Sequence, residues 1–254
     1  MSLIHAHWYS PALQKQVATS IILPDSGRPP FATYYLLHGL SDDHTIWLRR
    51  TRIESYIEGL PLMVVMPDGF RGFYTDNENG PPYATYMAED LVNFVERNFP
   101  AKGSRSARCI GGLSMGGYGA LRLSFAYPHL YASANSHSGA LLHGQYPPRY
   151  HTRGVLSPAE ARRMFGPRPA GSSHDLLHLA CQAKRADKLP RILIDCGTDD
   201  HLLEDNRRFH AELEKIGVPH TYREFPGAHT WDYWETHVKD AIDFHAKSLR
   251  LKTN

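Results

Sequence analysis

Gly112-Leu113-Ser114-Met115-Gly116-Gly117 is the stretch of sequence that decides the fold. An apolar run at residues 107–110 precedes it and an alanine- and leucine-rich segment at residues 118–127 follows it, which predicts a strand, a sharp turn and a helix. Gly-x-Ser-x-Gly at such a turn is typical of a nucleophile elbow. There a strained backbone holds the serine hydroxyl clear of the sheet, and side chains at the two glycines would collide with neighbouring chain. The pentapeptide also occurs as an ordinary turn before a helix, so the rest of the chain has to decide.

Length and composition indicate one globular domain, residues 1–254, with 42% hydrophobic and 21% charged residues. The net charge of +2 and the absence of long runs of like charge argue against nucleic-acid or membrane partners. The N-terminus lacks the basic start and apolar stretch of a signal peptide, and nowhere do about eighteen apolar residues run together. We therefore expect a cytoplasmic protein, with homo-oligomer formation left open.

Cysteine and histidine usage predicts neither a disulfide framework nor a metal centre. The three cysteines, Cys109, Cys181 and Cys196, are an odd number, and two of them lie in apolar strand-like runs, so buried free thiols are expected. Sixteen histidines are scattered without His-x-x-x-His or Cys-x-x-Cys spacing. No metal and no cofactor are expected in the chemistry.

Strand-like and helix-like segments alternate along the chain. The expected strands are residues 14–23, 33–37, 62–66, 107–110, 131–137, 191–196 and 220–225. The expected helices are residues 45–60, a segment that carries Leu91 and Val95 and ends at Pro100, and residues 118–127, 203–216 and 231–249. This alternation predicts an α/β fold with a mostly parallel central sheet flanked by helices.

Residues 141–185 break the alternation. The segment is rich in proline and arginine and lies between two predicted sheet strands. It is either a mobile surface insertion or a small cap over the site, and the concentration of function in long loops favours the cap.

A serine nucleophile needs a base and an acid that orients the base, and the expected chain order is Ser, then Asp, then His. Asp199 and Asp200 directly follow the predicted strand 191–196, and His229 directly follows the predicted strand 220–225. Three other histidines after Ser114 compete with His229 but fall on predicted helices: His201, His210 and His237. Ser114 and His229, with one of the two aspartates, are therefore the candidate catalytic triad.

An oxyanion hole needs two backbone donors aimed at the developing negative charge. The amide of Met115 is one candidate by its position after Ser114. The second is the amide of Leu40, because His38-Gly39 after the strand at residues 33–37 allows close approach of the backbone. An ordinary glycine turn is the alternative interpretation.

Several blocks of the chain resemble the esterase D family of α/β-hydrolases, and most of all its bacterial tributyrin-type acetyl esterases. The blocks are residues 37–44 (LHGLSDDH), 47–51 (WLRRT), 65–69 (VMPDG), 72–76 (GFYTD), 112–119 (GLSMGGYG) and 229–234 (HTWDYW). The resemblance runs from about Tyr9 to the last predicted helix. It implies an α/β-hydrolase fold.

The resemblance also implies a serine carboxylesterase that hydrolyses short-chain acyl esters through Ser114, Asp200 and His229, with the amides of Leu40 and Met115 in the oxyanion hole. The family pattern Gly-x-x-Asp selects Asp200 over Asp199. Related S-formylglutathione hydrolases carry Leu-Thr-Cys-Thr where this chain has Leu-Ser-Asp-Asp at residues 40–43. A thioesterase of that kind, a feruloyl-type esterase and an acyltransferase are alternatives, and a non-catalytic binding module with a hydrolase fold is the rival from another class.

Overall fold

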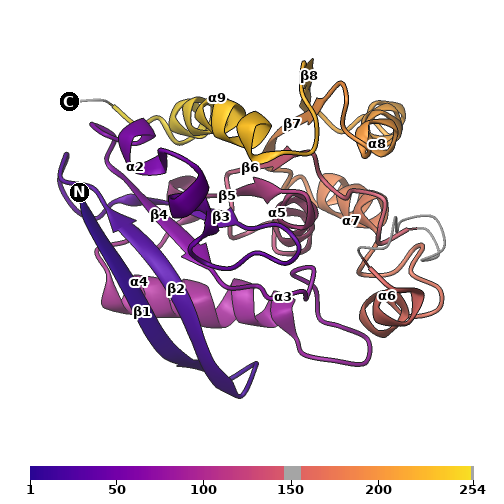
Figure 1. The fold of residues 1–254 in the computed structure, drawn as a ribbon, viewed down its shortest axis with the longest axis horizontal. Coiled ribbons are helices and arrows are strands. Elements are labelled where there is room, and N and C mark those ends of the chain that lie inside the picture. Colours follow the sequence, from indigo (N-terminus) through magenta and orange to yellow (C-terminus); the bar gives the residue numbers. More distant parts are fainter. Residues whose placement is uncertain (146–155, 253–254) are drawn as a thin grey trace.

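The computed structural model describes residues 1–145 and 156–252, and Figure 1 shows how its helices and strands are arranged. The described strands form one sheet of eight, in the order β1-β2-β4-β3-β5-β6-β7-β8. Their bounds are β1 Ser2–Ser10, β2 Lys15–Leu23, β3 Ala32–Leu37, β4 Leu62–Pro67, β5 Arg108–Leu113, β6 Ser133–His137, β7 Arg191–Gly197 and β8 Thr221–Phe225. The pairs among β3 to β8 are parallel, and β1 and β2 add an antiparallel edge. The predicted mostly parallel α/β sheet is confirmed.

Helices cover both faces of the sheet. Their bounds are α1 Ile46–Arg50, α2 Ile53–Tyr56, α3 Tyr83–Thr85, α4 Val92–Asn98, α5 Met115–Ala126, α6 Pro158–Phe165, α7 Leu176–Arg185, α8 Leu203–Lys215 and α9 Trp231–Leu249, with a π-helical turn at Tyr86–Leu91 and a 3-10 turn at Arg105–Ala107. α9 and α2 lie on one side of the sheet and α4 on the other (Figure 1).

The two hydrophobic cores follow from the alternation of side chains along each strand. In β3, Tyr35 and Leu37 belong to the core that contains residues of α4, α5 and α7. Tyr34 and Leu36 belong to the opposite core, which contains residues of α1, α2 and α9. A strand buried on both faces is apolar throughout, which is why the pattern at residues 33–37 predicted its position.

Outside the predicted insertion, the structure differs from the sequence prediction at β1 and at residues 45–60. β1 was not predicted. It pairs with β2 from Ser2↔Leu23 to Ser10↔Lys15, but its inward residues alternate with exposed histidines, and no glycine turn marks the hairpin. The single helix expected at residues 45–60 is instead α1 and α2, because Thr51 takes an extended conformation between them. The hydroxyl of Thr51 donates to the carbonyl of Trp47 and accepts from the amide of Ile53.

The segment predicted as an insertion, residues 141–185, is described only in part. Residues 146–155 lie outside the described residues, and they include Pro147, Pro148, Arg149 and Arg153. The described remainder contains α6 and α7. Leu179, Ala180 and Ala183 of α7 are buried in the same core as α5. Single-domain organisation and a cap role for the insertion stay predictions.

A buried polar network crosses the core between α9 and the sheet. His245 of α9 is fully buried, with Nδ1 2.8 Å from the hydroxyl of Ser133 and Nε2 2.9 Å from Oδ1 of Asn135. The same Asn135 oxygen accepts the hydroxyl of Tyr34 at 2.8 Å. Because that oxygen can only accept, Nε2 of His245 carries a proton.

This network predicts a loss of stability on acidification. Burial, and after it the charge of His137, lowers the pKa of His245 to about 3, whereas an unfolded histidine titrates near about 6.5. The unfolded chain therefore binds an extra proton between these values, so the free energy of unfolding falls as the pH drops, by up to about 1.4 kcal/mol per pH unit for this group. In urea unfolding at pH 7 and pH 5, His245→Gln should lose less stability between the two pH values than the wild type. The exposed control His129→Gln should behave like the wild type, and an equal pH slope in His245→Gln would contradict the account.

Candidate active site

The predicted nucleophile elbow forms the turn between β5 and α5. Ser114 is half-buried and has φ 52° and ψ −114°, a strained conformation for a residue with a side chain. A Cβ added at Gly112 or at Gly116 would lie 2.5 Å from the carbonyl oxygen of Leu37. The expected collision at both glycines is confirmed, and its cause is the backbone of β3.

Neighbouring backbone fixes Ser114 in this conformation. Its amide donates to the carbonyl of His137 at 2.9 Å, and its carbonyl accepts from the amides of Tyr118 and Ala140, each at 3.1 Å. The elbow is thus tied to the carboxyl end of β6 as well as to its own helix. The serine hydroxyl is the part of the residue left to react.

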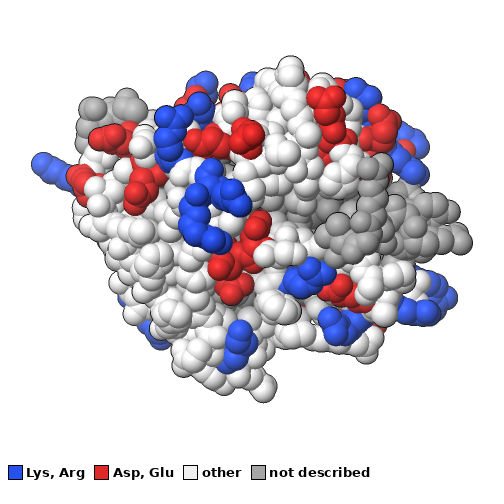
Figure 2. Space-filling view, viewed as in Figure 1, with Lys and Arg blue, Asp and Glu red and all other residues white. Residues whose placement is uncertain are grey.

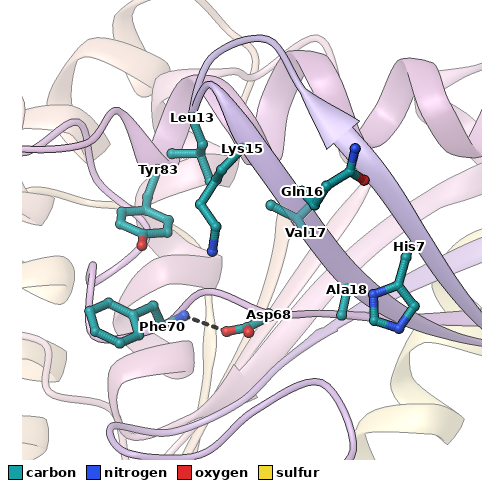
Figure 3. Close-up of a pocket in the computed structure, with 9 residues that line it drawn as sticks. All are labelled: His7, Leu13, Lys15, Gln16, Val17, Ala18, Asp68, Phe70 and Tyr83. Carbon is teal, nitrogen blue, oxygen red and sulfur yellow. Dashed lines mark hydrogen bonds between the residues drawn. The ribbon is translucent and has the colours of Figure 1, made fainter.

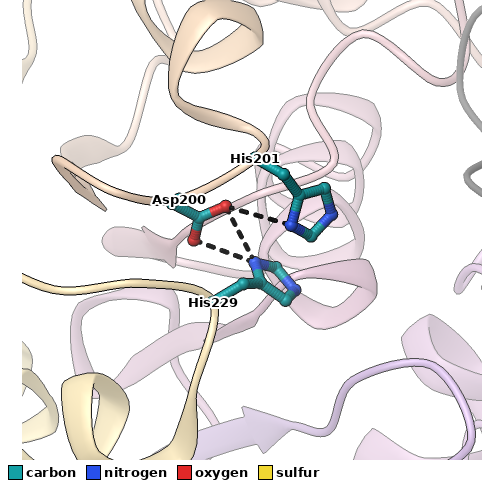
Figure 4. Close-up of side chains that lie close together, drawn as sticks. All are labelled: Asp200, His201 and His229. Atoms are coloured by element: carbon teal, nitrogen blue, oxygen red, sulfur yellow. Dashed lines mark hydrogen bonds and ion pairs between the residues drawn. The ribbon is translucent and has the colours of Figure 1, made fainter.

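His229 and Asp200 reach Ser114 from the ends of neighbouring strands. His229 follows β8, and its Nε2 is 3.1 Å from the hydroxyl oxygen of Ser114. Asp200 follows β7, and its two carboxylate oxygens lie 2.9 and 3.1 Å from Nδ1 of His229 (Figure 4). A carboxylate only accepts, so Nδ1 carries the proton in neutral His229, and the lone pair of Nε2 faces Ser114.

Asp200 is buried and charged. Burial by itself raises the pKa of this carboxyl, but the hydrogen bond and charge of His229, the amide of Leu202 at 2.8 Å and the hydroxyl of Ser138 lower it overall. The carboxylate is therefore ionised around neutral pH, as an acid that orients a histidine base must be. Asp199 is exposed and has no contact of this kind with His229.

The three competing histidines have partners other than Ser114. His201 was predicted on a helix but lies in the turn before α8, with Nδ1 3.7 Å from the nearer oxygen of Asp200. His210 on α8 has Nδ1 2.7 Å from Nε2 of His220, and His237 on α9 has Nδ1 2.9 Å from Asp240. The structure brings His229 to Ser114 and none of these.

The loop that carries Leu40 lies beside Ser114, and a buried histidine holds it. A Cβ added at Gly39 would be 3.8 Å from the Cβ of Ser114. Nε2 of His38 accepts the amide of Gly69 at 2.8 Å, so its Nδ1 donates to the carbonyl of Gly39 at 2.7 Å. Sequence reasoning used His38 only as the neighbour of a glycine. Its role as the anchor of this loop could not be recognised without its partner Gly69 in the loop after β4.

Another buried pair lies behind the elbow and was missed by sequence reasoning. Nδ1 of His137 lies 2.7 Å from Asp195, and the hydroxyl of Tyr233 donates to the same carboxylate at 3.0 Å. His137 is the residue whose carbonyl accepts the amide of Ser114. These side chains join β6, β7 and α9 directly beneath the loops that carry the candidate site.

A separate surface pocket of about 240 Å³ lies near the edge of the sheet (Figure 3). The side chains of Lys15 and Tyr83 point into it, and the carboxylate of Asp68 accepts the amide of Phe70 in its wall. Its lining contains none of Ser114, Asp200 and His229.

The fold and the site define an α/β-hydrolase with a serine beside a histidine and a buried aspartate. Comparison with protein families matches residues 10–244 to the model described as "Putative esterase". The chain belongs to this esterase family, and it is a carboxylic ester hydrolase, as predicted from the sequence.

Known relatives agree with this assignment. An acetyl esterase of Caldicellulosiruptor saccharolyticus is 30% identical over 263 residues, which cover 97% of this chain and 99% of the relative. Two solved Staphylococcus aureus structures, the fluorophosphonate-binding serine hydrolase FphF and the S-formylglutathione hydrolase FrmB, are each 29% identical with a TM-score of 0.85. Each alignment covers 96% of this chain and 98% of the other. The expected resemblance to the esterase D type is confirmed.

Acidic and basic side chains of the described residues are interspersed on the face seen in Figure 2. Within residues 1–145 and 156–252, the structure contains no helix of the length and apolar character needed to cross a membrane.

Proposed function

We propose that this chain hydrolyses short-chain acyl esters with Ser114 as the nucleophile, His229 as the general base and Asp200 as the group that orients His229. The observation that carries the proposal is the unbroken series of contacts from the Ser114 hydroxyl through both ring nitrogens of His229 to the Asp200 carboxylate. No cofactor or metal enters these steps. A cytoplasmic location and a homo-oligomer stay predictions.

The proposed reaction has two stages. Ser114 attacks the ester carbonyl while Nε2 of His229 takes its proton, and the same nitrogen returns that proton to the leaving alcohol. Water, activated by His229, then releases the acyl group from Ser114. The amides of Leu40 and Met115 would stabilise the oxyanion in both stages, each by about 3 kcal/mol in the transition state.

The proposed preference of this chain for short acyl groups is supported by its likeness to the acetyl esterase relative, whose alignment spans nearly all of both chains. A second candidate, hydrolysis of glutathione thioesters, is favoured by the likeness to the S-formylglutathione hydrolase structure. Residues 40–43 lack the cysteine-containing segment of those enzymes, so the ester reaction is preferred.

We also propose that the insertion acts as a cap through α6. Arg71 forms a two-pronged ion pair with Glu160 of α6 at 2.7 and 3.0 Å and donates to the hydroxyl of Ser41 at 3.1 Å. Ser41 directly follows Leu40, the candidate oxyanion donor. The ion pair therefore links α6 to the loop that would hold the reacting carbonyl.

The ester proposal is tested by steady-state hydrolysis of p-nitrophenyl esters from acetate to palmitate, with methyl ferulate and S-formylglutathione alongside. Activity should peak at the short acyl chains, and Ser114→Ala should lower kcat/KM by about 10⁴-fold or more, because the proposed nucleophile is removed. Ser106→Ala, which changes a surface serine, should retain wild-type rates. Turnover that survives Ser114→Ala would remove Ser114 from the mechanism. A peak on S-formylglutathione would favour the thioesterase, and a wild type inert to every substrate would favour the binding module.

The cap proposal is tested by Glu160→Gln, which keeps the size of the side chain and removes its charge. KM should rise about three- to fivefold with kcat nearly unchanged, since a partly exposed ion pair contributes about 1 kcal/mol. Arg71→Lys, which keeps one charged contact, should have a smaller effect. The control Glu224→Gln breaks the two-pronged pair with Arg207 between β8 and α8 and should leave KM unchanged. A lower melting temperature with an unchanged KM in Glu160→Gln would reduce the ion pair to a purely structural contact.

A further inference from the structure

His201 brings a second imidazole to the buried carboxylate of the candidate site. In Figure 4 the Nδ1 atoms of His201 and His229 both face Asp200. Nδ1 of His229 lies 2.9 Å from one carboxylate oxygen, and Nδ1 of His201 lies 3.7 Å from the other. One ligand atom from each of the three residues lies within 4.8 Å of the other two.

Two imidazole nitrogens and a carboxylate oxygen form a donor set that suits Zn²⁺ and neighbouring transition metals, and not Mg²⁺ or Ca²⁺, which prefer oxygen ligands. Tetrahedral Zn²⁺ with ligands about 2.0–2.2 Å away requires ligand atoms about 3.3–3.6 Å from each other. Oδ1 of Asp200 lies 3.1 Å from Nδ1 of His229 and 3.7 Å from Nδ1 of His201, which are distances just below and just above this spacing. The side chains of His201 and His229 are 40% and 20% exposed, so solvent reaches these two ligands, while the side chain of Asp200 is buried behind them.

The surroundings also favour a cation. Asp200 is ionised, as described above. Asp205 on α8 brings another carboxyl group near His201. The proposed ester chemistry uses only Ser114, His229 and Asp200 and assigns no role to His201. The ring of His201 packs edge-on against that of His229, with centroids 4.5 Å apart.

We propose that Asp200, His201 and His229 form an inhibitory site for Zn²⁺ or a similar transition-metal ion. This inference rests on the proposed function for its effect on activity. Neutral His229 carries one ring proton, on Nδ1 in the active arrangement. A metal bound at Nδ1 uses the lone pair there, so the ring proton passes through solvent to Nε2. Nε2 then has no lone pair with which to accept the proton of Ser114, and acylation stops.

The test uses the full chain, first freed of metal with a chelator, and measures Zn²⁺ binding by equilibrium dialysis beside ester hydrolysis. Zn²⁺ should inhibit the wild type reversibly, with activity restored by chelator, and Mg²⁺ should not inhibit. His201→Phe keeps a ring against His229 but removes its nitrogens. It should hydrolyse esters at nearly the wild-type rate without metal, bind one Zn²⁺ fewer and need about tenfold or more Zn²⁺ for inhibition. The control His129→Phe, at an exposed position, should match the wild type in Zn²⁺ binding and inhibition. If His201→Phe folds poorly, His201→Gln replaces it in the same measurements.

Zn²⁺ inhibition that is equal in wild type and His201→Phe would overturn the proposal, and so would a wild type that Zn²⁺ does not inhibit. The binding measurement separates this inference from the proposed function. If the chain hydrolyses no ester but the wild type binds one more Zn²⁺ than His201→Phe, the metal site stands and the ester chemistry fails.

Discussion

The close approach of the nucleophile elbow to β3 is the constraint on which the rest of the site depends. Gly112 and Gly116 both lie so near the carbonyl of Leu37 that a single added carbon would collide with it. This contact brings Ser114, at the end of β5, beside the loop that follows β3. One packing arrangement thus strains Ser114 and brings it near the loop that carries the candidate donor Leu40. Gly112 and Gly116 are required because this packing leaves no room for a side chain at either position.

Buried polar groups then hold the loops around the elbow. His38 links the loop after β3 to the loop after β4, and the His137–Asp195 pair joins β6 to β7 beneath the site. Such groups are costly to bury unless they are hydrogen-bonded, so they restrict the loops to one arrangement only while their partners remain in place. The same reasoning gives Asp200 its low pKa, because its charge in a buried position depends on His229, Leu202 and Ser138.

The sequence predicted correctly those elements that a single local pattern of residues defines. Continuous apolar runs gave the central parallel strands, and the spacing of Ser114, Asp200 and His229 after those strands follows from the topology of a parallel sheet. Sequence prediction failed where contacts between distant segments decide the outcome. Thr51 splits a predicted helix through its hydroxyl, and β1 is recruited by its pairing with β2. The anchoring of His38 leaves no spacing pattern in the chain, because its partner Gly69 lies in another loop. His201 directly follows Asp200 in the sequence, but the fold alone brings both residues to His229.

Covalent labelling with a fluorophosphonate, followed by peptide mass spectrometry, tests the central claim most directly. The account predicts a single adduct on Ser114, because an activated hydroxyl attacks the phosphorus centre as it would an ester carbonyl. Labelling should be lost in Ser114→Ala and strongly slowed in His229→Ala, in which the base is missing. An adduct on another residue, or labelling that is equal in wild type and Ser114→Ala, would contradict the account.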